Sequence, residues 1–297
     1  MNKGGIMFKG AIVAIVTPFK DGKVDEEALR RLVNEQIAAG TKAISPCGTT
    51  GEASTLSHEE HDRVIEIVID EAKKRVPVIA GTGSNSTVEA IRLTKHAWEA
   101  GADAVLIVCP YYNRPSQEGL YQHYKAIAEA VPIPIIVYNI QGRTGVNMLP
   151  ETLARLVKMP NIVGVKEASG SIKQMSDVIR LCGPDFDVLS GDDAFTLPLL
   201  SLGGKGVISV ISNVAPADMS AMVDAFFAGD LKKAQELHFK MSPLIDVLFI
   251  ETNPAPVKAA LAMMGKIAYE VRLPLCRLLE KNEAVLRKAM QDYGLLK

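Results

Sequence analysis

Eight short β-branched runs, each followed by a longer amphipathic segment, constrain the fold of this chain more than any other feature. The first run begins near residue 10 and the eighth near residue 206, so the repeat averages about 28 residues. Every connection between runs is long enough to hold a helix, which predicts parallel strands. The predicted strands are Ala11–Thr17, Ala43–Cys47, Val76–Ala80, Ala104–Cys109, Pro134–Asn139, Ile162–Glu167, Phe186–Ser190 and Gly206–Ile211.

The segments between these runs carry helical signals. Gly40 and Gly101 stand where a glycine commonly ends a helix. Beyond the eighth run the pattern is helical only. The predicted helices include Asp25–Ala39, His58–Arg75, Val88–Ala100 and Gln117–Ala130, followed by Leu231–Val247, Pro256–Met264 and Pro274–Tyr293.

This alternation predicts an α/β fold, a (β/α)₈ TIM barrel with a C-terminal all-helical appendage. An eightfold barrel of about 250 residues has a repeat of roughly 31 residues, close to the repeat observed. A doubly wound open sheet is the alternative, but no G-x-G-x-x-G motif follows the first strand. We therefore expect the barrel in residues 1–229 and the helical appendage in residues 230–297.

Composition excludes several classes of protein. The 297 residues include 33 basic and 34 acidic ones, so neither nucleic acid nor an anionic membrane is an expected partner. No apolar run approaches the length of a membrane span, and the N-terminus lacks a signal-peptide pattern, so the cytoplasm is the expected location. The cysteines lie far apart without C-x-x-C spacing and are expected to be reduced. They are Cys47, Cys109, Cys182 and Cys276.

A lysine near the end of the sixth strand is a candidate nucleophile. In a (β/α)₈ barrel the active site lies at the carboxyl ends of the strands. Period-two alternation puts Ile162, Gly164 and Lys166 on one face, which would aim the Lys166 amine into the barrel. Burial lowers a lysine pKa and supplies the neutral amine that attacks a carbonyl. The alternative is a lysine that extends to water or pairs with an acid.

Two further strand ends carry polar side chains. Tyr138 ends the fifth strand and suits a proton relay, and Arg143 in the following loop suits a carboxylate, although each is also an ordinary residue. After the second strand, Gly48-Thr49-Thr50-Gly51-Glu52 places two hydroxyls between glycines. Such a loop permits close approach of the backbone to a ligand, and a plain turn is the alternative.

Two glycine-containing segments are weaker candidates. Gly203-Gly204-Lys205 precedes the eighth strand and therefore lies at the wrong end of the barrel, so we expect a tight turn. Gly191-Asp192-Asp193 offers fewer oxygen ligands than a magnesium site usually has, and Asp193 suits a helix N-cap.

The histidines of one helix form no evident metal site. His58 and His61 share a helix face, but no third ligand accompanies them, so no metal is expected. Ser57 and Glu60 form a capping box, which predicts that the helix begins here.

Taken in order, these motifs resemble the dihydrodipicolinate synthase family of pyruvate-dependent class I lyases and aldolases. The resemblance covers essentially the whole chain, and the Arg-Thr-Gly context of Arg143 favours the synthase over sialic acid lyases. The motifs are Gly48-Thr49-Thr50-Gly51-Glu52, Pro110-Tyr111-Tyr112-Asn113-Arg114-Pro115, Tyr138-Asn139-x-x-x-Arg143-Thr144-Gly145, Gly164-Val165-Lys166-Glu167, Ser190-Gly191-Asp192-Asp193, Gly206-Val207-Ile208-Ser209 and Asn253-Pro254-x-Pro256-Val257-Lys258.

The resemblance implies a Schiff-base enzyme of lysine and diaminopimelate biosynthesis that uses no cofactor. Lys166 would form an imine with pyruvate, which would then condense with L-aspartate 4-semialdehyde. The implied proton relay consists of Tyr138, Thr49 and Tyr112, with Tyr112 supplied by a neighbouring subunit. The implied substrate contacts are Thr50, Ile208, Arg143 and Gly191.

The resemblance also implies feedback inhibition by L-lysine and an oligomer. Glu89 would pair with the amino group of the effector, Tyr111 with its carboxylate and His58 with its side chain. A shared Tyr112 requires at least a dimer, and the family implies a homotetramer that is a dimer of dimers. The implied effector residues are Ala53, Ser54, His58, His61, Asn85, Glu89 and Tyr111.

One departure and two alternatives qualify the resemblance. Gln141 replaces the proline usual in the family, which is expected to loosen the loop before Arg143. Cys47 and Cys109 match no role and are expected to be small buried residues. The alternatives are an aldolase that uses the same imine on a sugar acid or 4-hydroxy-2-oxoglutarate, and a silent ligand-binding barrel, which the presence of Lys166 disfavours.

Overall fold

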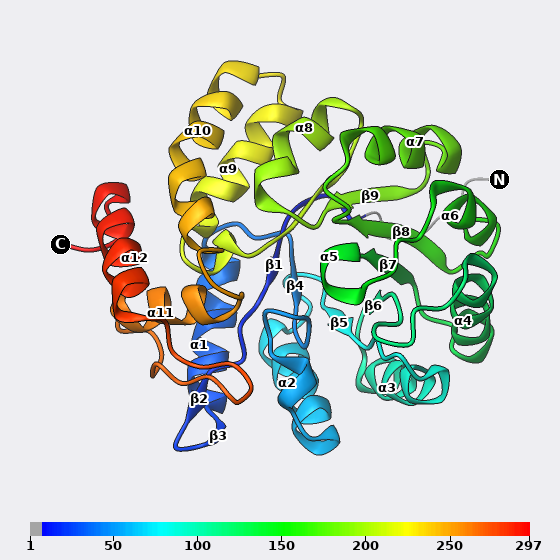
Figure 1. Cartoon of the computed structure of the whole chain (residues 1–297), viewed down its shortest axis with the longest axis horizontal. Helices are drawn as coiled ribbons and strands as arrows, with labels where there is room; N and C mark the ends of the chain where they lie inside the picture. Colours follow the sequence, from blue (N-terminus) through cyan, green and yellow to red (C-terminus); the bar gives the residue numbers. More distant parts are fainter. Residues whose placement is uncertain (1–7) are drawn as a thin grey trace.

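The computed structural model describes residues 8–297 and contains the predicted barrel (Figure 1). Eight strands form one sheet in the order β4-β1-β10-β9-β8-β7-β6-β5, and neighbouring strands run parallel. A parallel bridge between Ile44 and Val78 joins the two ends of this order and closes the sheet. The fold is therefore a (β/α)₈ barrel, and the first seven residues of the predicted domain 1–229 lie outside the described residues.

The barrel strands lie where the sequence predicted them, although most are shorter. They are β1 (Gly10–Ala14), β4 (Ala43–Ser45), β5 (Ile79–Gly81), β6 (Ala104–Val108), β7 (Ile135–Asn139), β8 (Ile162–Glu167), β9 (Asp187–Ser190) and β10 (Gly206–Ser209). A hairpin of β2 (Phe19–Lys20) and β3 (Lys23–Val24) was not expected. Two-residue strands leave no periodicity in the sequence, and the turn depends on the positive φ of Asp21 and Gly22.

Helices surround the strands, and their ends follow local capping rules. Ser57 and Glu60 form the predicted capping box, and Gly101 ends its helix in the left-handed conformation. The helices of the barrel are α1 (Glu26–Ala38), α2 (His58–Ala72), α3 (Thr87–Ala100), α4 (Gln117–Ala130), α5 (Gln141–Thr144), α6 (Pro150–Leu156), α7 (Ile172–Cys182), α8 (Thr196–Ser201) and α9 (Pro216–Phe227). Short 3₁₀ turns are η1 (Ala53–Thr55), η2 (Asp193–Phe195) and η3 (Ile211–Asn213).

The strands separate two apolar clusters. On β7, Ile136 and Tyr138 belong to the cluster inside the barrel, whereas Ile135 and Val137 belong to the larger cluster beneath the surrounding helices. This alternation follows from the period of two along a strand. It directs the end of β7, and with it the Tyr138 side chain, into the barrel.

An irregularity in β8 changes the face predicted for its first residue. Ile135 pairs with Ile162, but the next residue of β7 pairs with Gly164, so Val163 is an extra residue in β8. Ile162 packs in the outer cluster, and Val163 packs against the inner one. The prediction that Ile162 shares a face with Lys166 is therefore wrong, because the bulge interrupts the alternation.

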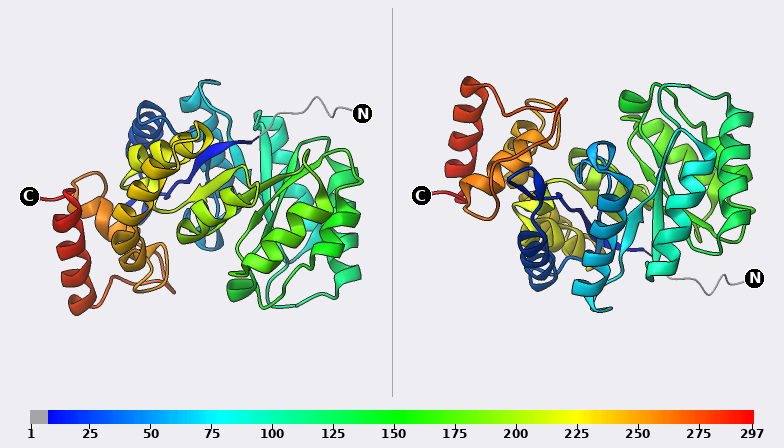
Figure 2. Two further views of the ribbon diagram at one scale, coloured as in Figure 1. Left: turned by 90° about the horizontal axis from the view of Figure 1, so that it is seen from above. Right: turned by 90° about the horizontal axis from the view of Figure 1, so that it is seen from below.

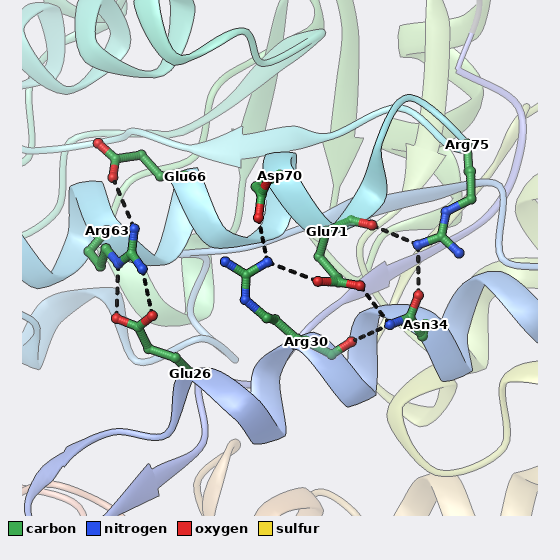
Figure 3. A network of polar contacts seen from close by, with 8 residues as sticks. All are labelled: Glu26, Arg30, Asn34, Arg63, Glu66, Asp70, Glu71 and Arg75. Carbon is green, nitrogen blue, oxygen red and sulfur yellow. Dashed lines mark hydrogen bonds and ion pairs between the residues drawn. The ribbon is translucent and has the colours of Figure 1, made fainter.

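A polar network ties α1 to α2 on the outside of the barrel (Figure 3). The Arg63 guanidinium donates two hydrogen bonds to the Glu26 carboxylate, at 2.9 and 2.6 Å. Arg30 bridges Asp70 and Glu71 at 2.5 and 2.8 Å. Exposed pairs of this kind contribute little stability individually. Their effect here is to hold α2 against α1, and α2 carries two of the predicted effector residues.

The C-terminal region is helical, as predicted, and consists of α10 (Leu231–Val247), α11 (Ala255–Met263) and α12 (Glu280–Tyr293). These helices gather at one end of the molecule, opposite α4 and α6 (Figures 1 and 2). The expected boundary between residues 229 and 230 falls just before α10. In residues 8–297 no helix combines the length and apolar character needed to cross a membrane.

The last predicted helix begins six residues later than expected. Residues 274–279 are not helical, and α12 begins at Glu280. The Leu278 N–H donates to the Tyr269 hydroxyl at 2.8 Å, and the Leu279 N–H donates to Glu251 at 2.9 Å. Because distant side chains accept these protons, the segment is held without a helical ladder.

Candidate active site

Lys166 extends from β8 into the barrel beside Tyr138 of β7. The two residues are register partners, and Lys166 Nζ lies 4.2 Å from the centroid of the Tyr138 ring. The lysine is only 6% exposed. Among residues 8–297, no carboxylate lies within ion-pair distance of its amine. The amine is therefore buried without an acid partner, and it does not extend to water.

This environment changes the charge state of Lys166. Burial lowers its pKa to about 8, because the ammonium loses its hydration. The negative charge of Asp193 opposes this change, and the positive charge of Arg143 adds to it. A neutral fraction of the amine is therefore present near neutral pH, which is what attack on a carbonyl requires.

Tyr138 lies beside this amine with its phenol buried. Burial raises the pKa of Tyr138 to about 12, while the charge of Arg143 and a hydrogen bond with the Thr49 hydroxyl act in the opposite direction. The phenol is therefore protonated at neutral pH and linked to a second hydroxyl. Two hydroxyls in contact can pass a proton between them.

Gly191, which follows β9, leaves room for the lysine. A Cβ atom there would lie 3.1 Å from Cγ and 3.2 Å from Cε of Lys166, and 2.8 Å from the Cβ of Ala168. A side chain at this position would clash with Ala168 and crowd Lys166. The structure thus gives the predicted substrate contact Gly191 a steric role beside the amine.

The prediction that Asp193 caps a helix is wrong. Asp192 caps η2, because the turn begins one residue earlier than expected. Asp193 is buried, and its Oδ2 accepts hydrogen bonds from the N–H groups of Val210 at 3.0 Å and Ile211 at 2.9 Å. Burial raises the pKa of Asp193 to about 6, so the group is still ionised at neutral pH. It thereby fixes the chain just after Ile208 and supplies a negative charge to the site.

Thr50 and Arg143 are joined through one residue of the C-terminal region. The Asn253 Nδ2 donates to the Thr50 hydroxyl at 3.0 Å, and Arg143 donates to the Asn253 carbonyl at 3.2 Å. Because the Thr50 oxygen accepts this bond, its own O–H can still donate to a ligand. Sequence reasoning assigned Asn253 no function of its own, since the contact joins residues separated by 203 positions.

The loop that carries Arg143 is a closed helical turn. The N–H groups of Arg143 and Gly145 donate to the carbonyls of Ile140 at 3.2 Å and Gln141 at 2.9 Å. Gln141 is the first residue of α5, a position that also accepts proline. The expected loosening by Gln141 stays a prediction.

A cavity of about 560 Å³ lies beside this group of side chains. Thr49, Tyr138 and Arg143 line it together with Asn253. A second cavity, of about 590 Å³, is lined only by residues of α10 and α12 and contains none of the predicted site residues. Three predicted site residues therefore share the first cavity, whereas Lys166 contacts the lining residue Tyr138 without being part of the lining itself.

Five of the predicted catalytic and substrate-binding residues do not line this cavity: Lys166, Thr50, Gly191, Ile208 and Tyr112. Ile208 is buried in β10, where its side chain belongs to the inner cluster. Tyr112 is 90% exposed and has a φ of 69°, a left-handed conformation that is uncommon outside glycine. In a single protomer Tyr112 thus points to solvent, and the geometry leaves it available to another subunit.

Six of the seven predicted effector residues line the same cavity. His58 Nε2 lies 2.8 Å from Glu89, which also accepts a hydrogen bond from Ser84. Asn85 lies outside the lining and donates to the Tyr111 carbonyl at 3.2 Å. The effector residues that line the cavity are Ala53, Ser54, His58, His61, Glu89 and Tyr111.

The two histidines differ in their surroundings. His58 is exposed, whereas His61 is buried and its Nδ1 has no hydrogen-bond partner within the described chain. Burial lowers the pKa of His61 to about 4, so it is neutral at physiological pH. Of these two histidines, His58 is therefore the one that offers a surface imidazole to a ligand.

Cys47 and Cys109 are buried, as predicted. Burial raises the pKa of Cys109 to about 12 and that of Cys47 further. Their thiols are therefore protonated and unreactive at neutral pH. In the described part of the chain, no three His, Cys, Asp or Glu side chains are grouped as a metal site.

Sequence reasoning also missed an ion pair beneath the Thr49–Thr50 loop. Glu52 and Lys258 are both completely buried, with 2.5 Å between Oε1 and Nζ. The glutamate and the lysine stand in two quoted motifs, Gly48–Glu52 and Asn253–Lys258. Each motif contains one charged residue, of opposite sign, but 206 positions separate the two and only the fold brings them together.

Comparison with known proteins identifies relatives over nearly the whole chain. A model of the Dihydrodipicolinate synthetase family matches residues 7–293. The chain is 74% identical over 290 residues to the 4-hydroxy-tetrahydrodipicolinate synthase of Syntrophus aciditrophicus, which covers 98% of this chain and 100% of that protein.

Solved structures show the same fold. The chloride-inhibited dihydrodipicolinate synthase of Acinetobacter baumannii, complexed with pyruvate, superimposes with a TM-score of 0.95 at 52% identity and covers 97% of this chain and 99% of that one. The enzyme of Cyanidioschyzon merolae with lysine bound has a TM-score of 0.95 at 44% identity, over 97% of this chain and 99% of that one.

Proposed function

The chain belongs to the dihydrodipicolinate synthetase family and is a lyase, and we propose that it is a 4-hydroxy-tetrahydrodipicolinate synthase. It condenses pyruvate, bound as an imine, with L-aspartate 4-semialdehyde in lysine biosynthesis. The observation that carries this proposal is the Lys166 amine, buried beside Tyr138 without an acid partner. A pyruvate complex of a related synthase supports the choice of first substrate.

The reaction begins at the Lys166 amine. The neutral amine attacks the pyruvate carbonyl, and water leaves to give a protonated imine. The imine withdraws electrons, so the pyruvate methyl loses a proton and becomes an enamine. The enamine carbon attacks the aldehyde carbon of L-aspartate 4-semialdehyde, whose oxygen gains a proton. The amine of the second substrate then displaces Lys166 and closes the ring, and no oxidant or reductant is consumed.

The surrounding residues bind the substrates and move protons. Tyr138 and Thr49 pass protons between the reacting atoms and the cavity, with Tyr112 of a neighbouring subunit completing the relay. The Thr50 O–H and the main chain at Ile208 hold pyruvate. Arg143 binds the carboxylate of the second substrate.

Borohydride reduction in the presence of pyruvate tests this proposal. Mass analysis of the peptides is expected to find the adduct on Lys166, and wild-type protein without pyruvate is the control. A reduced protein without an adduct on Lys166 would remove the proposal. A panel of aldehydes then separates a synthase, which turns over L-aspartate 4-semialdehyde, from an aldolase that prefers a sugar acid or 4-hydroxy-2-oxoglutarate.

The site is completed by a second subunit in a homotetramer. The exposed, left-handed Tyr112 supports this part of the proposal. Complementation tests it: Tyr112→Phe and Lys166→Met variants, each impaired alone, are mixed under conditions that exchange subunits. Recovered activity is expected, because one site of a mixed dimer contains both native residues. Sedimentation of the wild type distinguishes a dimer from a tetramer.

L-lysine is the proposed feedback inhibitor. The lysine-bound relative supports this part, as does the cavity lined by His58, Glu89 and Tyr111. Millimolar L-lysine is expected to lower the rate of wild type and to affect a Glu89→Gln variant less, because the amino group loses its charged partner. A rate that L-lysine leaves unchanged would contradict this part alone. The cytoplasmic location stays a prediction that cell fractionation tests.

A further inference from the structure

The Glu52–Lys258 pair joins the barrel to the C-terminal helices. Lys258 lies in α11, and Glu52 lies in the loop between β4 and η1. One carboxylate oxygen of Glu52 accepts from Lys258 Nζ at 2.5 Å, and the other accepts from the Arg272 N–H at 3.1 Å. Neither charged side chain has any exposed surface. The carboxylate is thus held from two sides by the C-terminal region.

Stability alone does not explain a buried ion pair. Removing two charges from water is costly, and well-packed neutral side chains often replace such pairs without loss of stability. The pair instead fixes the local geometry, because each buried charge requires its partner within a narrow range of positions.

Glu52 closes the turn at the end of the loop that carries Thr49 and Thr50. Its φ is 52°, in the left-handed region that a residue other than glycine adopts at a cost. Its N–H donates to the Thr49 carbonyl at 3.1 Å, so the same residue closes the turn. The side-chain anchor therefore fixes the conformation of the segment that presents both threonine hydroxyls.

Aromatic packing restricts the anchor further. Lys258 Nζ lies 4.1 Å from the centroid of the buried Phe19 ring, and Arg272 Cζ lies 4.2 Å from the same centroid. Phe19 thus contacts the Lys258 ammonium that holds Glu52, and also the guanidinium of Arg272, whose backbone N–H holds the other Glu52 oxygen. The Lys258 contact adds attraction where the ammonium has no exposed surface.

A second contact also joins the C-terminal region to the Thr49–Thr50 loop. Asn253, five residues before Lys258, donates to the Thr50 hydroxyl at 3.0 Å. One C-terminal segment therefore holds the Thr49–Thr50 loop at two points, the Thr50 hydroxyl and the Glu52 carboxylate. We infer that Glu52 and Lys258 are positioning residues, which set the Thr50 hydroxyl for the carboxylate of pyruvate. This inference rests on the proposed function.

The double variant Glu52→Gln/Lys258→Met tests the inference. It leaves no unpaired buried charge, and the glutamine retains an acceptor for the Arg272 N–H, so the protein is expected to fold. Displacement of Thr50 weakens one hydrogen bond to a carboxylate, so the KM for pyruvate is expected to rise about tenfold. The KM for L-aspartate 4-semialdehyde is expected to change less than about twofold, because Arg143 is held through Asn253.

Lys266→Met is the matched control. Lys266 pairs with Glu35 of α1 at 2.7 Å, so this variant also breaks an ion pair between the C-terminal region and the barrel. It does not touch the Thr49–Thr50 loop, and both Michaelis constants are expected to stay at the wild-type value. Circular dichroism and thermal melts establish that each variant is folded.

The outcomes separate the inference from the proposed function. A folded double variant with a wild-type KM for pyruvate would overturn the inference and leave the function intact. If the double variant does not fold, Glu52→Gln is measured in the same way, and failure of both to fold would assign the pair to stability alone. A wild type that forms no adduct on Lys166 would remove both.

Discussion

Two buried lysines of this protein have similar surroundings, but only one of them is paired with a carboxylate. Lys166 Nζ lies 4.2 Å from the Tyr138 ring centroid, and Lys258 Nζ lies 4.1 Å from that of Phe19. Burial lowers the pKa of both. Glu52 contacts Lys258 directly and holds it as an ammonium, whereas no carboxylate within residues 8–297 lies that close to Lys166.

The comparison shows what makes a buried amine reactive. Burial alone destabilises the ammonium, but a carboxylate in contact restores it and makes the amine a poor nucleophile. Asp193 influences Lys166 only through its charge, while its oxygen binds the backbone after β10. The absence of a contact partner distinguishes the proposed nucleophile from the positioning residue.

Replacing each lysine by methionine is the strongest way to break this comparison. Lys166→Met is expected to abolish the borohydride-trapped pyruvate adduct and to lower turnover by on the order of 10³-fold, because the nucleophile is gone. Lys258→Met is expected to retain the adduct wherever the protein folds. Mass analysis of intact protein after reduction measures both, and an adduct on the Lys166→Met variant would disprove the assignment.

For the free energy of unfolding the order of the two variants should be reversed, with the larger loss in Lys258→Met. Lys258→Met leaves the buried Glu52 carboxylate unpaired and is expected to lower the free energy of unfolding by about 3–5 kcal/mol. Lys166→Met removes an amine that burial disfavours in its charged form, so no comparable loss is expected. Chemical denaturation at pH 7 gives both values. Equal losses would mean that the two lysines do not differ as described.

The pH dependence of imine formation sharpens the contrast. The rate is expected to rise with pH and to level off above about 8, the pKa to which burial lowers Lys166. The folded protein binds fewer protons than the unfolded chain between this value and the ordinary 10.5, so this group makes stability increase with pH across that window.

Asp193→Asn gives a matched control for this profile. The asparagine oxygen can still accept from the N–H groups of Val210 and Ile211, but the charge that raises the pKa of Lys166 is gone. The profile is therefore expected to move to lower pH, with a several-fold faster rate of imine formation at pH 7. A shift to higher pH would contradict this account of the site.

The smallest effect is expected at the buried cysteines. Cys47→Ala and Cys109→Ala remove thiols that are protonated at neutral pH, so adduct formation is expected to stay within about twofold of wild type. Single-turnover trapping with pyruvate measures this. Loss of the adduct in either variant would show that a third buried group takes part in the chemistry.

The sequence by itself determined the number of barrel strands and their order along the chain. Period-two runs separated by helical segments specify parallel strands, and their number and spacing specify an eightfold barrel. Local rules also located the capping box of Ser57 and the glycine that ends α3. These features depend on neighbouring residues only, so a sequence pattern records them. The resemblance to a family then indicated which residues near the strand ends form the site.

Only the tertiary structure decided which charges meet. The bulge at Val163 moved Ile162 to the outer face, and an early turn gave the cap of η2 to Asp192. Glu52 meets Lys258 across 206 positions of sequence, a separation at which no local pattern links two residues. A buried charge finds its partner through packing of the whole chain. For that reason the sequence predicted a reactive lysine in the barrel but did not reveal the lysine in α11 that holds the neighbouring loop.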